Sequence, residues 1–567
     1  MENNKKKTST SQQSRKNSAA KTEVRNIEVI NKTSKTEYII VNLLCMLLFI
    51  SFGYIAIMSI FQTSVIDPAS YGNEVILYQD DNIVLNLLCM SLFTVFLFRM
   101  NKHTQFFEKV NMKFMEIGLF AFVSVIGLIW VLSVTSIPAA DSYNIFETAT
   151  QAAEGNYNSF FNNSNFYNSS FFNGISYYNC YPFQLGFVFL CEIIYRIFGT
   201  DSSMPIQIIN VFCVAAAYLA VAKITKITFN RRKIEFIAIM FLAGCFQPIF
   251  LSTFVYGNII GMCCALWASY FLIRYFRSQK YVLLIPCAVL LVLSTLAKYN
   301  NMIYLVAFVI MLIIHTVKAK KWQSIAFALA ICIATTGTSS LVIMSYENRA
   351  GTKLESGVSQ VLYLDMGLNE SYMAPGWYNG VALGLYKDNN CNIDIAEDQA
   401  WAEIDARLDK FGSDPDYALD FFSKKILSQW NETTYESIWV SEVKSHESEI
   451  NFIGDSMYNG SLGQFFELYF NFYMQILFIL FATGIFFIFA NKKSGIETVL
   501  LPLVVLGGFG YHLLFEGKSQ YILTYVPLLI PVASYALSCI LDGKYEKIKE
   551  FVGKLKTIPE TSAKRDA

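Results

Sequence analysis

The sequence predicts an α-helical protein that crosses a membrane many times. Hydrophobic residues make up 54% of the 567 residues and charged residues only 16%, whereas a typical soluble domain has about 45–50% apolar and about 25% charged residues. Apolar runs of roughly 20 residues, enough to cross a hydrocarbon core about 30 Å thick, recur along the chain. The formal net charge is zero, so charge gives no reason to expect a nucleic-acid partner.

The first apolar run, residues 38–61, follows a tail, residues 1–37, that is basic and rich in Ser, Asn and Gln. Because a cleavable signal peptide has a short basic region and this tail is long, the sequence favours an uncleaved anchor whose disordered tail stays in the cytoplasm. Counting the apolar runs, with short ones tolerated inside a bundle, predicts about twelve spans. They lie at 38–61, 83–98, 116–137, 205–225, 234–253, 259–277, 281–297, 302–316, 322–344, 466–490, 496–514 and 520–541.

The Lys and Arg residues concentrate in short loops, which the positive-inside rule assigns to the cytoplasm. With the spans above, every basic loop falls on that side. The apolar segment 181–199 would invert the topology of all later loops if it crossed the membrane, so we interpret it as a re-entrant or interfacial helix. The alternative is that 181–199 spans and a short segment such as 281–297 does not. The basic loops are 99–113, 223–233, 274–280, 318–322, 491–495 and 542–556.

This topology places two large segments outside, the first outer loop (138–204) and an insert (346–465) with the composition of a folded, mainly helical domain. Within the insert, 394–412 has helical periodicity, with Ile395, Ala402, Ile404 and Leu408 near one face. The predicted parts are therefore the tail 1–37, a transmembrane module 38–345, the extracytoplasmic domain 346–465, C-terminal transmembrane helices 466–541 and a basic cytoplasmic tail 542–567.

A single carboxylate, Asp141, stands where the span 116–137 ends, in the stretch IPAADSYNIFETATQAAEGNY, which predicts a helix ending at Gly155. At the edge of a membrane such a charge is either solvated surface or, in a protein-lined cavity, a functional group. We interpret Asp141 as a general base. The alternative is that it completes the cap of the helix that begins there.

These features resemble the GT-C-fold membrane glycosyltransferases, in particular the protein O-mannosyltransferase-like and aminoarabinose-transferase-like group. The similarity rests on Asp141 in its helical context, on NCYPFQLGFVFLCEIIYRIFG with Tyr181, on LAKYNNMIYL with Lys298, and on FEGKSQYILTYVPLLIPVASYAL with Glu516. It covers most of residues 115–345 and 495–541. The order of the motifs and their shared side of the membrane are characteristic of the group.

The resemblance implies transfer of one sugar from a polyprenyl-phosphate donor to an acceptor on the outer face, with Asp141 taking the acceptor's proton. The acceptor classes expected are a cell-wall polysaccharide, teichoic acid or surface protein. The protein would then be a multi-pass protein of the cell membrane with its active site on the extracytoplasmic face.

The leaving lipid phosphate needs cations near the interface. Lys298 and Lys518 lie at outer span ends and are expected to face it; the alternative is that both extend toward lipid headgroups. Glu516 would hold Lys518 or bind the sugar. The substrate-binding residues implied are Tyr181, Asn258, Lys298, Tyr299, Glu516, Lys518 and Tyr521, with Tyr299 and Tyr521 as hydrogen-bond donors.

Two positions depart from the family pattern. Asn258 stands where members often carry a second acid, which argues against a two-carboxylate or metal-assisted mechanism, and Gln520 stands where Arg is common. His512 and Glu516 could share a helical face, but no cluster of metal-ligand spacing accompanies them. We therefore expect no metal and no cofactor beyond the lipid donor.

Two other classes of protein have similar hydropathy. A transporter or a flippase for lipid-linked saccharides would have polar or broken segments near mid-membrane in matched halves, whereas the polar residues here cluster at outer span ends. A polysaccharide polymerase would transfer whole chains and is expected to carry many outer arginines. Only Arg349 and Arg407 stand clearly in the large insert.

Overall fold

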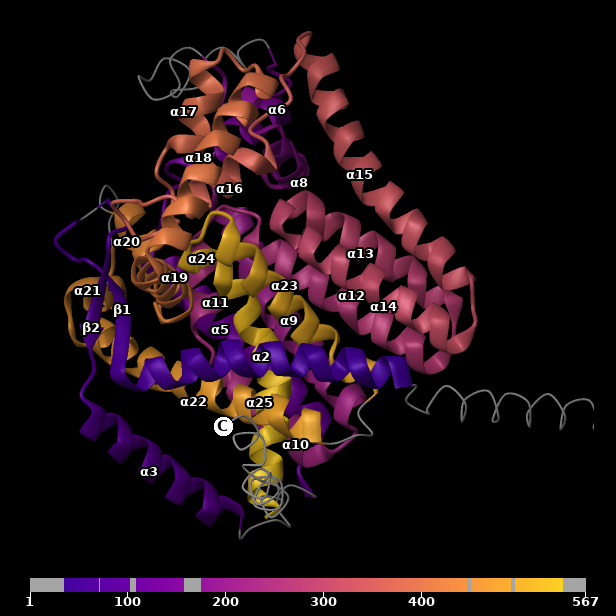
Figure 1. Cartoon of the computed structure of the whole chain (residues 1–567), viewed down its shortest axis with the longest axis vertical. Coiled ribbons are helices and arrows are strands. Elements are labelled where there is room, and N and C mark those ends of the chain that lie inside the picture. Colours follow the sequence, from indigo (N-terminus) through magenta and orange to yellow (C-terminus); the bar gives the residue numbers. More distant parts are fainter. Residues whose placement is uncertain are drawn as a thin grey trace, which may run out of the picture.

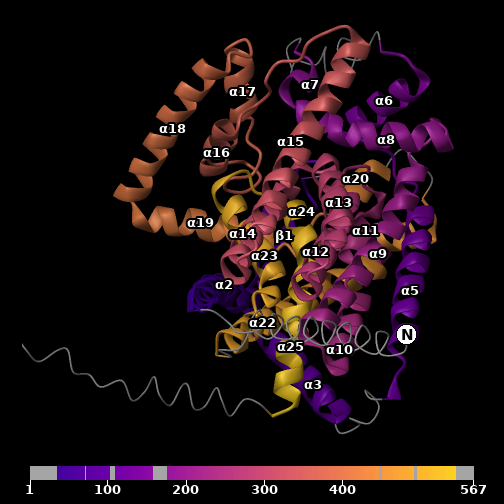
Figure 2. The same cartoon turned by 90° about the vertical axis from the view of Figure 1, so that its right-hand side faces the viewer.

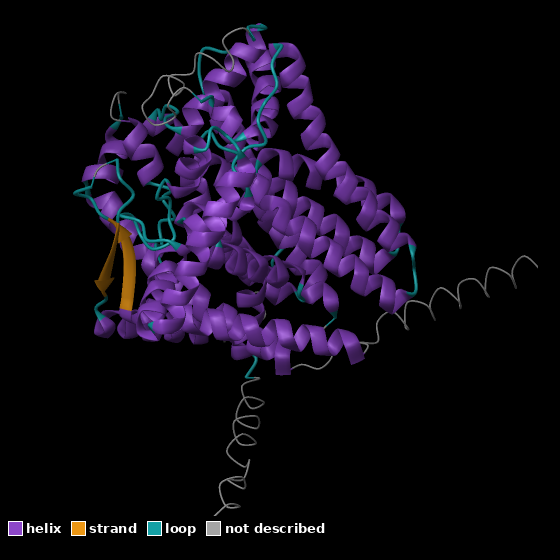
Figure 3. Ribbon diagram, turned by 45° about the horizontal axis from the view of Figure 1, so that its top comes forward, coloured by secondary structure: helices purple, strands orange, loops and turns teal. Residues whose placement is uncertain are grey.

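The computed structural model of the chain shows a bundle of helices with one β-hairpin in its described part (Figures 1 and 3). It describes residues 35–70, 72–101, 109–157, 175–445, 450–490 and 495–543. The predictions for the two tails, 1–37 and 542–567, and for the basic loop 491–495 therefore lie mostly outside the described residues, and that for the basic loop 99–113 lies partly outside them.

Eight helices among the described residues are long and apolar enough to cross a membrane. They confirm that the chain is a helical multi-pass membrane protein and account for eight of the predicted spans. They comprise α2 (Lys35–Phe61), α5 (Met112–Val134), α9 (Met204–Phe229), α12 (Asn258–Ser278), α14 (Met302–Ala319), α15 (Gln323–Ala350), α22 (Ser461–Ala490) and α25 (Val526–Leu541), with α14 and α25 extended by the short turns η4 (Tyr299–Asn301), α24 (Ser519–Ile522) and η6 (Leu523–Tyr525).

The predicted span 234–253 is a pair of helical pieces bent by 44°, α10 (Arg232–Gly244) and the stretch formed by α11 (Gln247–Phe250) and η2 (Leu251–Thr253). A proline at the start of α11 explains the break, because it cannot donate a backbone hydrogen bond to the preceding turn. Counted as one span, the pair brings the described helices of spanning length to nine.

The remaining three predicted spans form shorter apolar helices, so the count of twelve is reduced to eight or nine helices of spanning length. These are α3 (Ile83–Asn101), α13 (Leu284–Ala297), preceded by η3 (Tyr281–Leu283), and α23 (Leu500–Leu514), preceded by η5 (Ile496–Thr498). The segment 181–199, predicted not to cross, forms η1 (Pro182–Gln184) and α8 (Leu185–Phe198). At about 1.5 Å per residue, the 14 residues of α8 rise about 21 Å, which is less than the core thickness of about 30 Å.

The spans pack closely because small residues face neighbouring helices, as is usual where lipid competes for the apolar surface. A Cβ on Gly127 of α5 would lie 2.7 Å from the Val211 side chain of α9. A Cβ on Gly484 of α22 would lie 2.4 Å from the carbonyl oxygen of Val532 in α25. Each glycine therefore permits a helix contact that alanine would push apart.

One end of the bundle is joined by polar contacts between the basic loops. Lys233 contacts Asp542 at 2.8 Å and Asn101 at 2.8 Å, which brings α3, α10 and the end of α25 together. Arg277, at the end of α12, pairs with Glu497 at 3.4 Å, and the Lys321 ammonium donates to Gln279 at 2.9 Å. The loops predicted to be cytoplasmic thus meet at one end, and the candidate residues at the starts of α6 and α12 lie at the other.

A β-hairpin that the sequence analysis did not predict follows α2 directly. Strands β1 (Gln62–Ile66) and β2 (Ile76–Asp80) pair antiparallel, with Gln62 opposite Asp80 and Ile66 opposite Ile76. Figure 3 shows the hairpin as the orange arrows at one edge of the molecule. It packs on the insert, where Ser64 N donates to the Asn431 carbonyl oxygen at 3.1 Å.

Short helices fill the rest of the structure. In the first outer loop these are α6 (Asp141–Glu154) and α7 (Tyr177–Cys180). The insert holds α16 (Gln360–Leu368), α17 (Val381–Asp388), α18 (Ile393–Ser413), α19 (Pro415–Trp430), α20 (Trp439–Ser445) and α21 (Phe452–Asn459). In Figure 2, α16 to α19 stand away from the bundle on one side.

The helix predicted over 394–412 is α18, but of the residues predicted to share its apolar face only Ile404 is buried. Ala396, Ala400 and Ile404 are buried, whereas Ile395 and Leu408 are exposed. The small alanines, spaced four residues apart, allow α18 to approach its neighbour, and the larger apolar side chains point outward.

Candidate active site

Four loops meet at the end of the bundle opposite the basic loops. They are the start of α6, the turn before α12 (254–258), the turn between α13 and α14 (297–301) and the turn between α23 and α24 (515–518). Their backbones approach closely: a Cβ on Gly257 would lie 1.6 Å from the Ala297 carbonyl oxygen, and the Asn258 amide donates to the Gln520 carbonyl oxygen at 3.4 Å. Residues more than 350 positions apart in sequence are thereby collected at one place.

Asp141 is the first residue of α6 and is exposed. The N-cap position is Ala140, which makes no side-chain cap hydrogen bond and has φ 50° and ψ −132°, a region that residues other than glycine rarely adopt. The Ser142 hydroxyl instead donates to the Ala139 carbonyl oxygen at 2.7 Å and accepts from the Ala139 amide at 3.1 Å. Ser142 therefore makes two of the hydrogen bonds at this helix start.

A group of tyrosines surrounds the Asp141 carboxylate. Burial, followed by the charge of Asp141, raises the pKa of Tyr256 well above its usual value, and Asp141 is a hydrogen-bond partner of that tyrosine. The Gln184 amide also donates to the Tyr256 hydroxyl. For five further tyrosines outside the spans, burial is the largest cause of a raised pKa and the charge of Asp141 is another: Tyr177, Tyr178, Tyr181, Tyr363 and Tyr378. These hydroxyls remain protonated and can donate hydrogen bonds.

Lys298 faces two of these aromatic rings. Its ammonium lies 3.9 Å from the ring centre of Tyr256 and 5.1 Å from that of Tyr521. Burial lowers the pKa of Lys298 to about 7, while the charges of Asp141 and Glu516 act in the opposite direction. In the part of the chain that the structure describes, Lys298 has no ion-pair partner within 4.0 Å. Its charge is therefore balanced only by carboxylates at longer range.

Glu516 belongs to the same group. Burial raises its pKa to about 7; the charges of Lys518 and Lys298 oppose this rise, and that of Asp141 adds to it. The Tyr521 hydroxyl donates to the Glu516 carboxylate at 3.4 Å. Asp141, Lys298, Glu516 and Tyr521, all named from the sequence, thus lie within mutual electrostatic range.

Lys518 is already paired. Its ammonium lies 2.5 Å from Glu74, in the turn of the β-hairpin, and 3.4 Å from Glu436, in the turn before α20. Burial lowers the pKa of Lys518, but Glu436 and Glu74 outweigh burial and raise it above its usual value. The contact with a donor phosphate expected from the sequence remains a prediction, and the structure gives this lysine two carboxylate partners.

The other three residues named from the sequence lie at the rim or in the packing. Asn258 is buried between two of the four loops. The Tyr299 side chain is exposed, and its ring packs 5.6 Å from that of Phe183. Tyr181 is half-buried, with its ring 5.1 Å from that of Tyr177.

The insert fixes the 512–518 turn through α19. The Lys425 ammonium donates to the Phe515 carbonyl oxygen at 2.8 Å, and the Gln429 amide donates to the His512 carbonyl oxygen at 3.0 Å. The Gly517 amide donates to the Gly376 carbonyl oxygen at 2.9 Å. The sequence analysis missed these residues because each acts across a long stretch of chain and none belongs to a local motif.

Glu74, Glu436 and Tyr256 were missed as well. Tyr256 stands within the FVYGN turn, two positions before Asn258, so the signal was present. Glu436 follows Glu432 by four residues in the Trp-containing stretch WNETTYESIWV, a carboxylate pair in an otherwise uncharged context. No group of three or more His, Cys, Asp or Glu side chains able to hold a metal ion occurs within the described ranges.

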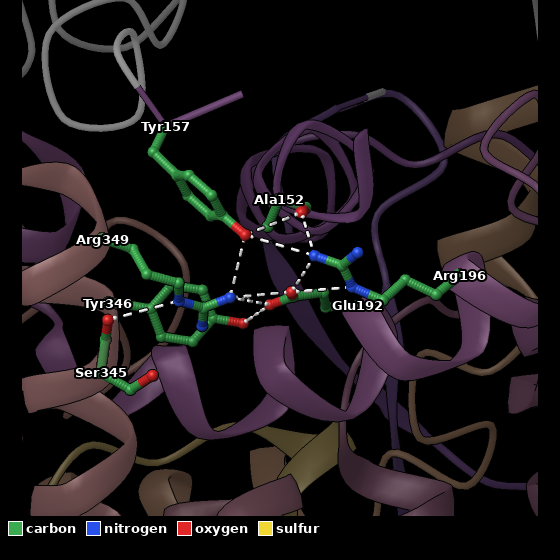
Figure 4. Close-up of polar contacts among 7 residues, drawn as sticks. All are labelled: Ala152, Tyr157, Glu192, Arg196, Ser345, Tyr346 and Arg349. Atoms are coloured by element: carbon green, nitrogen blue, oxygen red, sulfur yellow. Dashed lines mark hydrogen bonds and ion pairs between the residues drawn. The ribbon is translucent and has the colours of Figure 1, made fainter. Parts of the chain in front are cut away.

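A second polar cluster holds the far end of α6 (Figure 4). The buried Glu192 of α8 accepts hydrogen bonds from Arg349 and Arg196, each at 2.8 Å, and from the Tyr346 hydroxyl. Arg196 also donates to the Ala152 carbonyl oxygen at 2.7 Å. The cluster therefore ties α8 and α15 to the last turn of the helix whose first residue is Asp141.

Comparisons with known proteins give one family match. Residues 184–343 match the family described as dolichyl-phosphate-mannose-protein mannosyltransferase, which confirms the resemblance to the protein O-mannosyltransferase-like group. The matched range includes Tyr256, Asn258 and Lys298 and excludes Asp141 and Glu516. None of the curated proteins matches the chain.

Two solved structures are similar to the chain at low sequence identity. The crystal structure of the Archaeoglobus fulgidus oligosaccharyltransferase in complex with Zn and sulfate is 14% identical, with a TM-score of 0.39; the alignment covers 78% of this chain and 51% of that one, so the chain spans about half its length. The crystal structure of ArnT from Cupriavidus metallidurans bound to undecaprenyl phosphate is 11% identical, with a TM-score of 0.32 and coverage of 78% and 81%. Over residues 184–343, this multi-pass membrane chain is therefore similar to the dolichyl-phosphate-mannose-protein mannosyltransferases.

Proposed function

We propose that the protein transfers one hexose from a polyprenyl-phosphate donor to a hydroxyl group of an acceptor on the extracytoplasmic face of the membrane. The observation that carries this proposal is the meeting of an exposed carboxylate, Asp141, with Lys298 and a group of protonated tyrosines at one end of the bundle. Such a site can take a proton from an acceptor hydroxyl and stabilise the charge on a leaving phosphate, and transfer from a sugar phosphate requires both.

In the proposed reaction, Asp141 takes the proton of the acceptor hydroxyl as the oxygen attacks the anomeric carbon. The bond between that carbon and the phosphate oxygen breaks, and the electron pair leaves with the lipid phosphate. Lys298 stabilises the charge that develops there. The tyrosine hydroxyls and Glu516 are then available to bind sugar hydroxyls, which accept and donate hydrogen bonds.

Fewer observations bear on the identity of the sugar and of the acceptor. Mannose is the sugar in the description of the matched family, and we propose it as the first donor to test. A cell-wall polysaccharide, a teichoic acid and a surface protein each present the hydroxyl that Asp141 would deprotonate.

Labelling of single cysteines tests the side on which the site lies. On a background without the 12 native cysteines, Asn390→Cys in the insert is expected to react with a membrane-impermeant maleimide in intact cells. Lys320→Cys and Asn230→Cys, in the loops after α14 and α9, are expected to react only after permeabilisation, because basic loops stay in the cytoplasm. All three side chains are exposed, so access to solvent does not separate them. Labelling of Asn230→Cys from outside would mean that α8 or another short helix crosses the membrane.

A donor-cleavage assay tests the reaction itself. Purified protein in liposomes with polyprenyl-phosphate mannose and acceptor is expected to release free polyprenyl phosphate in step with sugar appearing on the acceptor. A flippase would move the labelled lipid between leaflets and leave it intact. Movement without cleavage, in the presence of cell-wall, teichoic acid and protein acceptors, would contradict the proposed function.

A further inference from the structure

The β-hairpin supplies a charged residue that reaches the candidate site from a distant part of the chain. Glu74 lies in the turn between β1 and β2, and its carboxylate is 2.5 Å from the Lys518 ammonium. Both side chains are 14% exposed, and the Glu436 side chain, 3.4 Å from the same ammonium, is fully buried. The pair is therefore largely removed from water. Loss of one partner would leave the charge of the other buried and uncompensated.

Glu436 binds the same segment by other contacts. Its carboxylate accepts from the Ser519 hydroxyl at 3.0 Å and from the Gln520 side-chain amide at 3.1 Å. Tyr435 and Glu436 have φ values of 50° and 57°, a conformation that costs energy in residues with side chains and that the surrounding contacts must maintain. Glu432 contributes to this by accepting from the Glu436 backbone amide at 2.9 Å.

The hairpin that carries Glu74 is itself held in place. The Asn431 amide donates to the Gln62 carbonyl oxygen at 2.5 Å, and Ile76 N donates to the Met373 carbonyl oxygen at 2.9 Å. Figure 1 shows the hairpin beside α19, which contacts β1. Glu74 is thus presented by a strand pair fixed to the insert and not by an isolated loop.

The segment that receives this contact has little regular structure of its own. Residues 516–518 lie between α23 and α24 without helix or strand, and Lys518 is extended, with φ −160° and ψ 143°. A lysine side chain has four rotatable bonds and many conformations to lose. The two carboxylates, from separate elements, hold the Lys518 side chain in one conformation. They thereby also fix Glu516, two residues earlier, and Tyr521, three residues later.

We propose that Glu74 is a positioning residue for sugar transfer: together with Glu436 it holds Lys518, and so keeps Glu516 and Tyr521 in place beside Asp141 and Lys298. This inference rests on the proposed function. It also gives the N-terminal pair α2 and α3 a role in the site, although both lie outside the residues that match the family.

Two double-mutant cycles on the full-length protein in detergent and in proteoliposomes test the proposal. Glu74→Gln, Lys518→Met and the double variant are compared in initial rates with a polyprenyl-phosphate mannose donor, and in melting temperature without substrate. Each single variant is expected to lose about 10- to 100-fold in kcat/KM, the range expected when a charge-assisted hydrogen bond is lost. The double variant is expected to lose no more than Lys518→Met, because Glu74 acts through that lysine. Asp80→Asn makes the same chemical change at an exposed position of the same hairpin and is expected to behave as wild type.

The outcomes separate the ion pair from the positioning role. Additive losses in kcat/KM, or a Glu74→Gln variant that transfers sugar at the wild-type rate while Asp141→Asn is inactive, would overturn the proposal even if the melting temperatures show coupling. Melting temperatures that add independently would show that the pair does not form. If Asp141→Asn and the Glu74 and Lys518 variants all transfer normally, the proposed chemistry fails and the positioning role with it, whereas the substrate-free melting cycle still reports the ion pair.

Discussion

Replacing Asp141 with Asn is expected to slow sugar transfer by about 10²–10⁴-fold, the usual contribution of a general base. The substitution keeps the size and much of the hydrogen bonding of the side chain and removes only its ability to take a proton. Initial rates in proteoliposomes, at matched protein level and saturating donor, measure the effect. Because the Asp141 charge raises the pKa of Lys298, donor binding is compared well below pH 7, where Lys298 keeps its proton and binding should be nearly unchanged.

The structure makes this substitution a clean test. The N-cap is Ala140, and asparagine serves at a helix start about as well as aspartate, so the start of α6 should survive the substitution. What the Asn variant loses structurally is a favourable charge at a helix N-terminus, worth about 0.3–1 kcal/mol, less than a tenfold effect in rate. Glu154→Gln, at the other end of the same helix, is the matched control. An Asp141→Asn enzyme within tenfold of wild type would remove this residue from the mechanism.

The spans were predictable because hydropathy over about 20 residues measures a real property, the free energy of placing a segment in hydrocarbon. The same measure also predicted spans at apolar helices such as α13 and α23, whose length does not confirm them, because it reads composition and not helix length. Helix faces were less predictable. In α18 the packing contact is made by Ala396 and Ala400, whose small size is the reason for the close approach, and a hydropathy pattern gives more weight to Ile395 and Leu408.

Part of the site was predictable for a similar reason. Asp141, Lys298 and Glu516 each stand just beyond an apolar run on the same predicted side, so topology alone brings them to one end of the bundle. Their environment was not predictable, since burial and the neighbouring charges that set the pKa of Lys298 and Glu516 depend on how four loops approach.

The ion pairs of Lys518 with Glu74 and Glu436 could not be predicted from the sequence. The hairpin had a readable signal, because QTSVI and ILYQD flank the turn residues of DPASYGN. No local pattern, however, connects Glu74 with a lysine 444 positions later. Contacts of that kind are created by tertiary packing, in this case by the fit of the hairpin onto the insert.

Replacing Lys298 with Met is expected to raise the KM for the lipid donor and to lower kcat/KM by about 10- to 100-fold. The change removes the charge, and with it the contacts of the ammonium with the rings of Tyr256 and Tyr521, while keeping most of the side-chain volume that packs there. A charge-assisted hydrogen bond to phosphate is worth roughly 1.5–3 kcal/mol, which corresponds to this range. Direct binding of polyprenyl phosphate without sugar should weaken to a similar extent. Unchanged kinetics and binding would mean that Lys298 only extends toward headgroups.

The pKa of Lys298 also predicts the direction in which kcat/KM changes with pH. Burial lowers the pKa of Lys298 to about 7, so the ammonium is present below that pH and is lost as the pH rises through it. kcat/KM reports ionisation of the free enzyme, in which no bound phosphate raises the pKa of Lys298. It should therefore fall above about pH 7. Lys298→Arg keeps its proton at all accessible pH values and should move this fall to higher pH. Glu516, whose pKa is also about 7, ionises in the opposite sense, and its charge raises the pKa of Lys298, so Glu516→Gln should keep the fall and move it to lower pH. If the Arg variant keeps the wild-type profile, the titrating group is not Lys298, and the lysine does not supply the charge that the donor phosphate meets.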